Sequence, residues 1–159
     1  MYDFATDAAD KPGLYRDLIA AADALTAGEP DAIANMANVA ALIWQLVPEL
    51  NWAGFYRMIG GELVLGPFLG KPACIRISLG KGVCGTAAAT RATQIVADVN
   101  SFAGHIPCDG DSASELVVPI VRDGEVIGVL DLDSPRLARF DAEDAAGCEA
   151  LIALLAPRL

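Results

Sequence analysis

The chain has 159 residues, of which 54% are hydrophobic, and this length suits one domain with a full core better than two. Its formal net charge of −10, from 21 acidic against 11 basic residues, disfavours a nucleic-acid partner, because phosphate binding relies on clustered Lys and Arg. No uninterrupted apolar run reaches the roughly 18 residues that span a bilayer, and residues 1–4 lack the basic and apolar regions of a secretory signal. We therefore expect a globular cytoplasmic protein without a membrane partner.

Two helices are predicted in the N-terminal part of the chain. The first covers about residues 11–27, where apolar residues such as Leu14 and Leu18 recur at helical spacing. The second covers about residues 31–47 and ends before Pro48, because proline cannot continue a helix.

Short strands follow, and together with the helices they predict an α+β fold. The hairpin in the last third of the chain turns around Asp123-Gly124, and Pro119 in its first strand indicates an edge strand or a bulge. Asp141 is placed to cap the final helix, which runs to about residue 155. The predicted strands cover residues 52–58, 62–65, 74–77, 94–97, 116–121 and 125–133, with a short Ala-rich helix at 82–89 and a long polar loop at 98–114.

The four cysteines of the chain are candidates for chemistry. In a protein without an export signal, cysteines are more often buried, metal-binding or catalytic than structural disulfides. The cysteines Cys74, Cys84, Cys108 and Cys148 form no CxxC pair, and His105 is the single histidine. This spacing disfavours a zinc site.

Two carboxylates on the last strand share one face of the predicted sheet. Asp131 and Asp133 are two residues apart, so both side chains point to the face of Ile127 and Val129. Carboxylates on an apolar face are costly unless they bind something, and their crowding raises the pKa of at least one. The alternative is that the two aspartates end an edge strand in solvent.

The register of the hairpin decides whether Glu115 joins these aspartates. A two-residue loop would place Glu115 opposite Leu132, on the wrong face. A three-residue loop that begins at Arg122, or a bulge near Pro119, would place Glu115 opposite Asp131. A functional role for Glu115 therefore predicts one of these two geometries.

Six segments, taken together and in this order, resemble the free methionine-(R)-sulfoxide reductases, which are stand-alone GAF domains. The resemblance spans about residues 12–157. It implies a single GAF-type domain with helices at about 11–47, a sheet and loops at about 51–134, and a closing helix at about 141–156. It further implies a central six-stranded antiparallel sheet with helices on both faces, a homodimer, and no metal or organic cofactor. The segments are NWAGFY (51–56), LGPFLGKPACIRI (65–77), GKGVCGTA (80–87), DVNSFAGHIPCD (98–109), SELVVPI (114–120) and GVLDLDSP (128–135).

The resemblance also implies a reaction in which thiols reduce a sulfoxide. A thiolate attacks the sulfoxide sulfur, an acid protonates the oxygen, and a second thiol resolves the sulfenic acid as a disulfide, which thioredoxin then reduces. By resemblance, Cys108 is the attacking thiol, and either Cys74 or Cys84 resolves it, with Cys74 preferred. Cys84 is expected in the first turn of its helix, where the helix dipole favours a thiolate. Cys148 is expected to be a core residue.

Three carboxyl groups are expected to supply the acid and the anchor for the ammonium group of a free amino acid. Glu115 is the expected proton donor and part of the substrate site, and Asp131 and Asp133 are expected to hold the ammonium group, although the sequence leaves open which of the three donates the proton. By resemblance, Trp52 and Tyr56, which share one face of the first strand, would surround the substrate's S-methyl group, although ordinary core packing explains their spacing equally well.

Two other functions remain open at this level. A GAF domain can be a sensor that binds a small molecule, and the same cysteines could form a thiol redox sensor that does not turn over a substrate. Oxidation of the thioredoxin system that depends on methionine sulfoxide separates the enzyme from both sensors.

Overall fold

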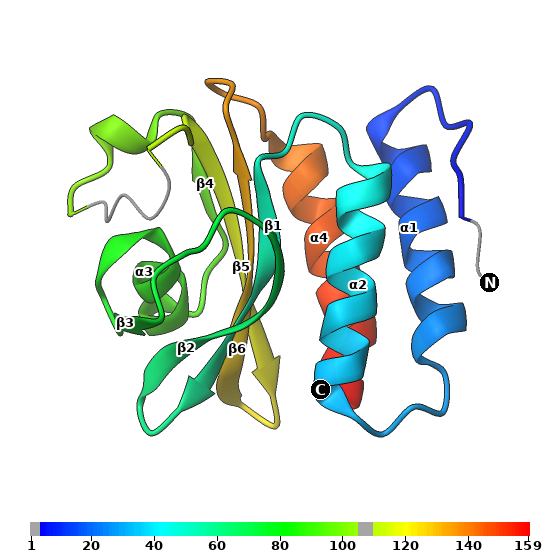
Figure 1. Ribbon diagram of the computed structural model, residues 1–159, viewed down its shortest axis with the longest axis horizontal. Coiled ribbons are helices and arrows are strands. Elements are labelled where there is room, and N and C mark those ends of the chain that lie inside the picture. Colours follow the sequence, from blue (N-terminus) through cyan, green and yellow to red (C-terminus); the bar gives the residue numbers. More distant parts are fainter. Residues whose placement is uncertain (1–3, 105–109) are drawn as a thin grey trace.

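The computed structural model describes residues 4–104 and 110–159 and shows a single layered α+β domain. Six strands form one sheet in the order β3-β2-β1-β6-β5-β4, and every neighbouring pair is antiparallel. Helices cover both faces of this sheet (Figure 1). The predicted fold class is therefore confirmed. Within the described residues, no helix has both the length and the apolar character needed to cross a membrane.

The helices and strands lie close to their predicted positions, with two differences around the second strand. Strand β2 continues to Gly70, beyond the predicted end at 65, because it pairs along the whole of β1 despite the proline in its path. Strand β3 begins at Arg76, so Cys74 lies in the preceding loop. The elements are α1 (Lys11–Thr26), α2 (Ala32–Leu46), β1 (Trp52–Ile59), β2 (Glu62–Gly70), β3 (Arg76–Ser78), α3 (Gly82–Thr90), β4 (Gln94–Val96), β5 (Ser114–Arg122), β6 (Glu125–Ser134) and α4 (Ala142–Leu155), with 3-10 turns at Val99–Ser101 and Ala156–Arg158.

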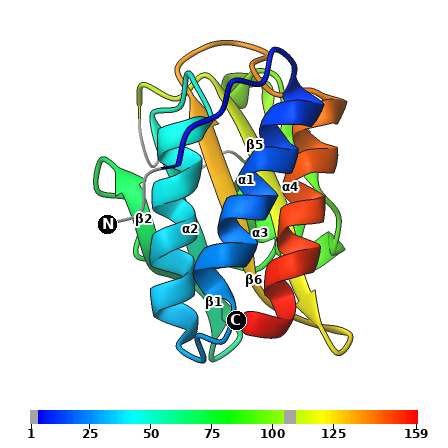
Figure 2. The ribbon, with the colours of Figure 1, turned by 90° about the vertical axis from the view of Figure 1, so that its right-hand side faces the viewer.

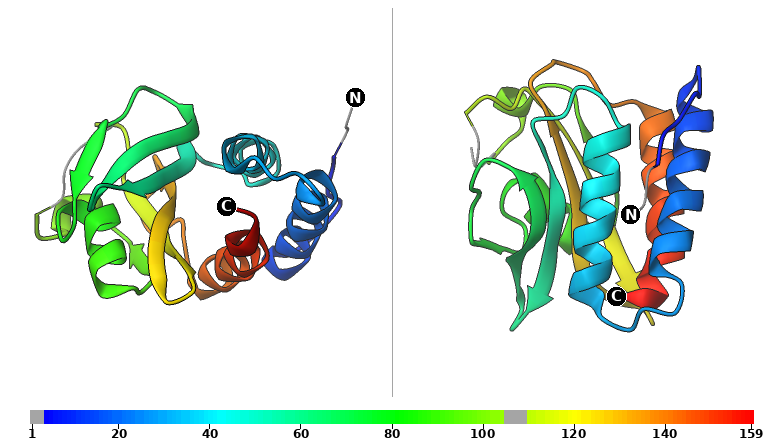
Figure 3. Two further views of the ribbon diagram at one scale, coloured as in Figure 1. Left: turned by 90° about the horizontal axis from the view of Figure 1, so that it is seen from below. Right: turned by 45° about the vertical axis from the view of Figure 1, so that its right-hand side comes forward.

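One face of the sheet carries a layer of three helices. Helices α2 and α4 lie against the strands, and α1 packs on the outer side of both (Figures 2 and 3). Their apolar faces meet the inward residues of the strands in one core, with Leu18, Ile43, Phe55 and Leu130 fully buried. Helix α1 approaches α4 closely at Gly147, where an added Cβ would lie 2.1 Å from the ring of Tyr15.

The opposite face of the sheet has a smaller apolar core beneath α3. This helix presents Val83, Ala87 and Ala88 to the strands, where they join Val117 and Val129 in a second buried cluster. Small residues on α3 let the helix lie close to the sheet. The predicted site residues of β1, β5 and β6 emerge on this face.

The β5–β6 hairpin combines a two-residue turn with a bulge. Asp123 and Gly124 both have positive φ, 52° and 79°, as in a type I′ turn. The register shifts between Ile120 and Val121, and this shift leaves Ile127 as an extra residue on β6. The bulge was predicted near Pro119, but its extra residue lies on the other strand.

This bulge corrects two details of the sequence interpretation. Glu115 pairs with Asp133, not with Asp131, because the extra residue on β6 moves the register in the opposite sense to the predicted one. Ile127 packs against the helical core and not on the face of Val129, since the bulge reverses the alternation of side chains at that point. The conclusion that Glu115 shares a face with the aspartates is confirmed.

Pro119 lies in an interior strand, so of the two predicted alternatives, an edge strand or a bulge, the structure shows the bulge. Strand β5 pairs with β6 on one side and β4 on the other, but β4 ends its pairing at Val117. The missing amide hydrogen of Pro119 is tolerated because the short β4 does not extend beside it.

Candidate active site

Three adjacent strands and one helix bring the described candidate residues to the same face of the sheet. Strand β6 lies between β1 and β5, so Asp133 has Trp52 as its neighbour on one side and Glu115 on the other. Asp131 lies two residues earlier on the same face, opposite Gly54 of β1. Helix α3 covers this region with Cys84 in its first turn, as predicted.

Cys84, Glu115 and Asp131 form a compact buried cluster. One donor atom of each lies within 4.8 Å of the other two, and the Sγ of Cys84 is 3.9 Å from Oε1 of Glu115. Only 6% of Glu115 and 6% of Asp131 is exposed, so the alternative of a strand end in solvent is wrong for Asp131. Asp133 is half-buried. The Oδ1 atom of Asp131 is buried and has no hydrogen-bond partner among the described residues.

Burial raises the pKa of every group in this cluster, and the neighbouring carboxylates raise the pKa of Glu115 and Cys84 further. Burial raises the pKa of Glu115 well above its usual range, and the charges of Asp131 and Asp133 raise it further. Burial also raises the pKa of Asp131, to about 7, although hydrogen bonds from Cys84 and Glu115 oppose that rise. At neutral pH the cluster therefore holds at least one protonated carboxyl group, as the crowding of carboxylates in the sequence predicts.

Cys84 is a protonated thiol, and the expected thiolate is not favoured. Burial raises the pKa of the Cys84 thiol well above its usual value, and the charges of Asp131 and Glu115 add to this effect. A helix N-terminus acts as only a partial positive charge, and two carboxylates within hydrogen-bonding range outweigh it.

Trp52 and Tyr56 are both buried and form an aromatic stack with Phe68. The ring centroids of Trp52 and Phe68 are 5.2 Å apart, and those of Trp52 and Tyr56 are 5.9 Å apart. Phe68 fits against β1 because its pairing partner is Gly54, where an added Cβ would lie 2.3 Å from the Cβ of Phe68. Phe68 was not predicted as a site residue, because Pro67 interrupts the alternation that predicts a strand. The available signal was Gly54, which lies between two aromatic residues on one face of β1.

The polar atoms of the same aromatics hold the loop that carries Cys74. Trp52 donates its Nε1 hydrogen to the carbonyl oxygen of Lys71 at 3.1 Å, and the hydroxyl of Tyr56 donates to the carbonyl oxygen of Cys74 at 3.0 Å. This loop is therefore attached to the floor of the candidate site at both ends. Trp52 and Tyr56 thus do more than fill a core.

The three cysteines within the described residues differ in their state. Cys84 and Cys148 are free thiols, whereas Cys74 is disulfide-bonded. Burial raises the pKa of Cys148 to about 12, and its side chain packs in the helical core, which confirms the prediction for this residue. Cys108, the predicted attacking thiol, lies in the segment 105–109, outside the described residues.

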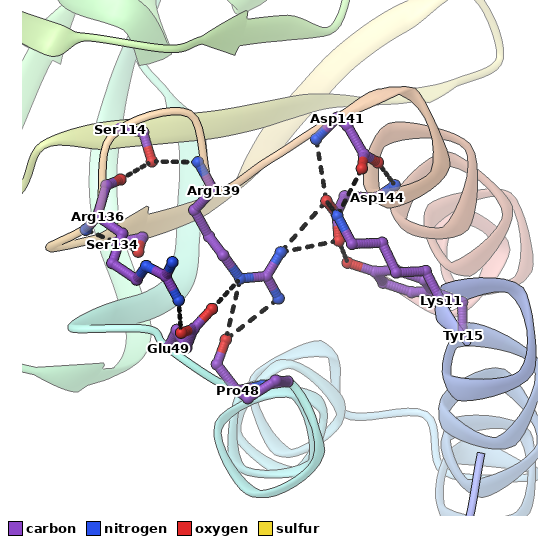
Figure 4. Close-up of polar contacts among 10 residues, drawn as sticks. All are labelled: Lys11, Tyr15, Pro48, Glu49, Ser114, Ser134, Arg136, Arg139, Asp141 and Asp144. Atoms are coloured by element: carbon purple, nitrogen blue, oxygen red, sulfur yellow. Dashed lines mark hydrogen bonds and ion pairs between the residues drawn. The ribbon is translucent and has the colours of Figure 1, made fainter. Parts of the chain in front are cut away.

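A hydrogen-bond network anchors the strand ends beside Glu115 and Asp133. Ser114 and Ser134 pair across β5 and β6 and are fully buried. The hydroxyl of Ser114 donates to the carbonyl oxygen of Arg136 at 2.6 Å and accepts from the amide of Arg139 at 3.3 Å (Figure 4). The loop after β6 is thereby fastened to the strands that carry the candidate carboxyl groups.

The same network continues into the helical layer through a buried carboxylate. Asp144 of α4 is fully buried and accepts hydrogen bonds from Arg139 at 3.2 Å, Tyr15 at 2.9 Å and Lys11 at 2.5 Å (Figure 4). It also accepts from the amide of Asp141 and completes a capping box at the start of α4. The predicted cap at Asp141 is confirmed. The role of Asp144 could not be predicted from local sequence, because its partners Lys11 and Tyr15 come from a distant segment.

Comparison with known proteins supports the resemblance found in the sequence. A family model described as GAF domain matches residues 33–157. The free methionine-R-sulfoxide reductase of Escherichia coli K12 is 48% identical over 146 residues, which cover 92% of this chain and 88% of that protein.

Solved structures give the same result. The free methionine-R-sulfoxide reductase of Neisseria meningitidis in complex with its substrate has a TM-score of 0.96 and 43% identity, covering 99% of this chain and 95% of that chain. A protein described as a GAF sensor from Burkholderia vietnamiensis has a TM-score of 0.91 and 58% identity, covering 94% and 96%. The chain therefore belongs to the GAF-domain family, in the branch that contains the free methionine-R-sulfoxide reductases.

Proposed function

We propose that this protein reduces free methionine-(R)-sulfoxide to methionine with its own cysteines. The observation that carries the proposal is the buried pair of Glu115 and Asp131, which have raised pKa values and lie on the face of the aromatic stack. The sulfoxide oxygen must be protonated before its bond to sulfur can break, and an acid that remains protonated near neutral pH can supply that proton. The names of the relatives from Escherichia coli and Neisseria meningitidis support the same substrate.

In the proposed reaction, the Cys108 thiolate attacks the sulfoxide sulfur and Glu115 protonates the oxygen. The protonated oxygen is transferred from the substrate sulfur to the Cys108 sulfur as the S–O bond of the sulfoxide breaks. The bond between the two sulfur atoms then breaks, methionine leaves, and Cys108 is a sulfenic acid. A second cysteine thiolate attacks the Cys108 sulfur, water leaves, and a disulfide forms. Two thiols are thus oxidised for each sulfoxide that is reduced, and a thioredoxin dithiol would return the disulfide to two thiols.

Cys74 is the better candidate for the resolving thiol. It is disulfide-bonded in the structure, whereas Cys84 is free and its raised pKa makes it a weak nucleophile. Cys74 also lies on the loop that Trp52 and Tyr56 hold beside the site. These observations favour a Cys74–Cys108 disulfide and leave Cys84 a different task.

The aspartates are proposed to bind the α-ammonium group of a free amino acid. The unpartnered Oδ1 of Asp131 is buried on the site face and needs a donor, and Asp133 lies two residues away on that face. The aromatic stack of Trp52 and Phe68 offers an apolar surface for the S-methyl group. A methionine inside a protein chain has no such ammonium group, so the proposed substrate is the free amino acid.

The test is NADPH oxidation in the presence of thioredoxin, thioredoxin reductase and free methionine-(R)-sulfoxide. The native protein should turn over and the Cys108→Ser variant should not, while Cys148→Ser, which alters a core thiol, should retain activity. The Cys74→Ser variant should release about one methionine per protein molecule and then stop. Equal rates on free methionine sulfoxide and on a peptide that contains it would contradict the proposed ammonium site. A folded, reduced native protein without turnover would instead favour a GAF-type small-molecule or thiol redox sensor.

Thioredoxin as the reductant, a homodimeric assembly and a cytoplasmic location complete the proposal, and each derives from the resemblance. Omitting thioredoxin from the assay tests the first of these, because turnover should then stop after one catalytic cycle. Sedimentation equilibrium tests the second, and fractionation of cells tests the third.

A further inference from the structure

The buried cluster beneath α3 offers donor atoms that methionine does not need. A thiol from α3 meets carboxyl groups from β5 and β6, and the donor atoms of Cys84, Glu115 and Asp131 all lie within 4.8 Å of one another. An ammonium group is satisfied by carboxylates alone, so the proposed substrate gives the Cys84 sulfur no role. Binding of the substrate therefore does not explain why the Cys84 sulfur lies beside the two carboxyl groups.

The spacing of these atoms is close to that of a tetrahedral zinc site. Zn–S bonds of about 2.3 Å and Zn–O bonds of about 2.0 Å place sulfur and oxygen ligands about 3.5 Å apart at the tetrahedral angle. The Sγ of Cys84 already lies 3.9 Å from Oε1 of Glu115, so a small rotation of either side chain would reach that distance. Three protein ligands would leave the fourth position open to water.

The same cluster contains a buried atom that either a metal cation or the substrate's ammonium group would satisfy. The Oδ1 atom of Asp131 has no hydrogen-bond partner within residues 4–104 and 110–159. A buried oxygen without a partner costs about 1–3 kcal/mol, and a positive ligand would remove that cost.

The mixture of sulfur and oxygen donors selects the kind of ion. Mg²⁺ and Ca²⁺ require six or more oxygen ligands, and one thiol with two carboxyl groups does not supply them. Zn²⁺ accepts thiolate and carboxylate together in four-coordinate geometry. The sequence disfavours a zinc site because no two cysteines are closely spaced, but these three ligands are brought together only by the fold.

We propose that Cys84, Glu115 and Asp131 form a Zn²⁺ site whose occupation excludes the substrate. Binding requires loss of the Cys84 thiol proton to solvent, so zinc affinity rises with pH. The exclusion of substrate rests on the proposed function, because the same carboxyl groups are assigned to the proton and the ammonium. Binding of the metal does not depend on that assignment.

The test uses Co²⁺ as a spectroscopic substitute for Zn²⁺ in the Cys74→Ser/Cys108→Ser variant, which retains only Cys84 and Cys148 as thiols. We expect one equivalent of Co²⁺ to bind with a thiolate-to-cobalt charge-transfer band and the intense visible bands of tetrahedral cobalt, and Zn²⁺ to abolish both. A further Cys84→Ser change should remove the charge-transfer band, whereas a Cys148→Ser change should preserve it. Absence of the band, or its persistence without Cys84, would overturn the proposal.

Two further measurements make the result specific to this cluster. The Asp131→Asn change in the same background should weaken Co²⁺ binding more than about 10-fold. An unchanged affinity would show that Asp131 is not a ligand of the metal. Thermal unfolding of each variant shows whether it is folded, and an Asp133→Asn variant serves as a matched control on the same strand. Mg²⁺ in excess should not displace Co²⁺, and displacement would contradict a thiolate site.

Competition with the substrate is measured separately from binding of the metal. Calorimetry first measures the affinity of the metal-free background variant for free methionine sulfoxide. A protein that binds no sulfoxide would refute the proposed function and would leave the proposal of a metal site unaffected. Where the sulfoxide binds, a saturating amount should displace Co²⁺ and bleach the charge-transfer band. A sulfoxide that binds while the band remains unchanged would show that the two ligands do not compete.

Discussion

Replacing Asp131 with asparagine should lower the pKa of Glu115 and thereby move the pH range of activity. Burial is the largest cause of the raised pKa of Glu115, and the charge of Asp131 is the next. At the upper limit of 4.8 Å that separates the donor atoms of the cluster, two unit charges in an effective dielectric constant of about 20 repel by about 3.5 kcal/mol, which corresponds to about 2.5 pH units. Because Asp131 itself titrates at about 7, only its charged fraction contributes near neutral pH, and a change of about one to two pH units is expected.

The sign of the change follows from the proposed role of Glu115 as a proton donor. Activity requires protonated Glu115 and is lost as the pH rises through its pKa. Removing the charge of Asp131 stabilises the ionised form of Glu115, so the basic limb of kcat/KM should move to lower pH in Asp131→Asn. Burial remains in the variant, and the pKa of Glu115 should therefore still exceed its usual range.

The measurement is the pH profile of kcat/KM together with a carboxyl titration of the substrate-free protein by infrared spectroscopy. Asp133→Asn is the matched control, because Asp133 shares the strand and face, is more exposed, and affects Glu115 less. The control should move the basic limb less than Asp131→Asn does. A basic limb that stays in place in Asp131→Asn, or moves to higher pH, would refute the assignment of Glu115 as the coupled acid.

Two further predictions concern stability and packing. Asp144→Ala removes the buried carboxylate that Arg139, Tyr15 and Lys11 share and leaves Arg139 paired only with the more exposed Glu49. This change should cost about 3–5 kcal/mol and lower the midpoint of thermal unfolding by about 10 °C. Asp141→Ala removes an exposed helix cap and should cost about 1 kcal/mol. Equal losses in urea unfolding would contradict the role given to Asp144. Gly54→Ala places a Cβ 2.3 Å from the Cβ of Phe68, so it should push β2 away from β1 and cost about 1–3 kcal/mol. Near-ultraviolet circular dichroism should show a loss of the aromatic signal, and an unchanged spectrum with full stability would show that the contact is easily relieved.

The β5–β6 hairpin shows where sequence reasoning reaches its limit. Alternation along the strand predicts that Asp131 and Asp133 share a face, and the demand that Glu115 join them predicts an irregularity in the hairpin. Both expectations are confirmed, but the extra residue is Ile127 on β6, so Glu115 lies opposite Asp133. The position of a bulge depends on how both strands pack against the two cores, and no local pattern contains that information.

Local periodicity, capping residues such as Asp141 and six recognisable segments were sufficient to predict the helices, the hairpin, the buried faces and the family. The tertiary structure decided the chemistry of individual groups. It placed Cys84 beside Glu115 and Asp131, where burial and neighbouring charge overcome the helix dipole and keep the thiol protonated. A pKa or a metal ligand set depends on the distances between residues that are far apart in the chain, and only the folded packing fixes those distances.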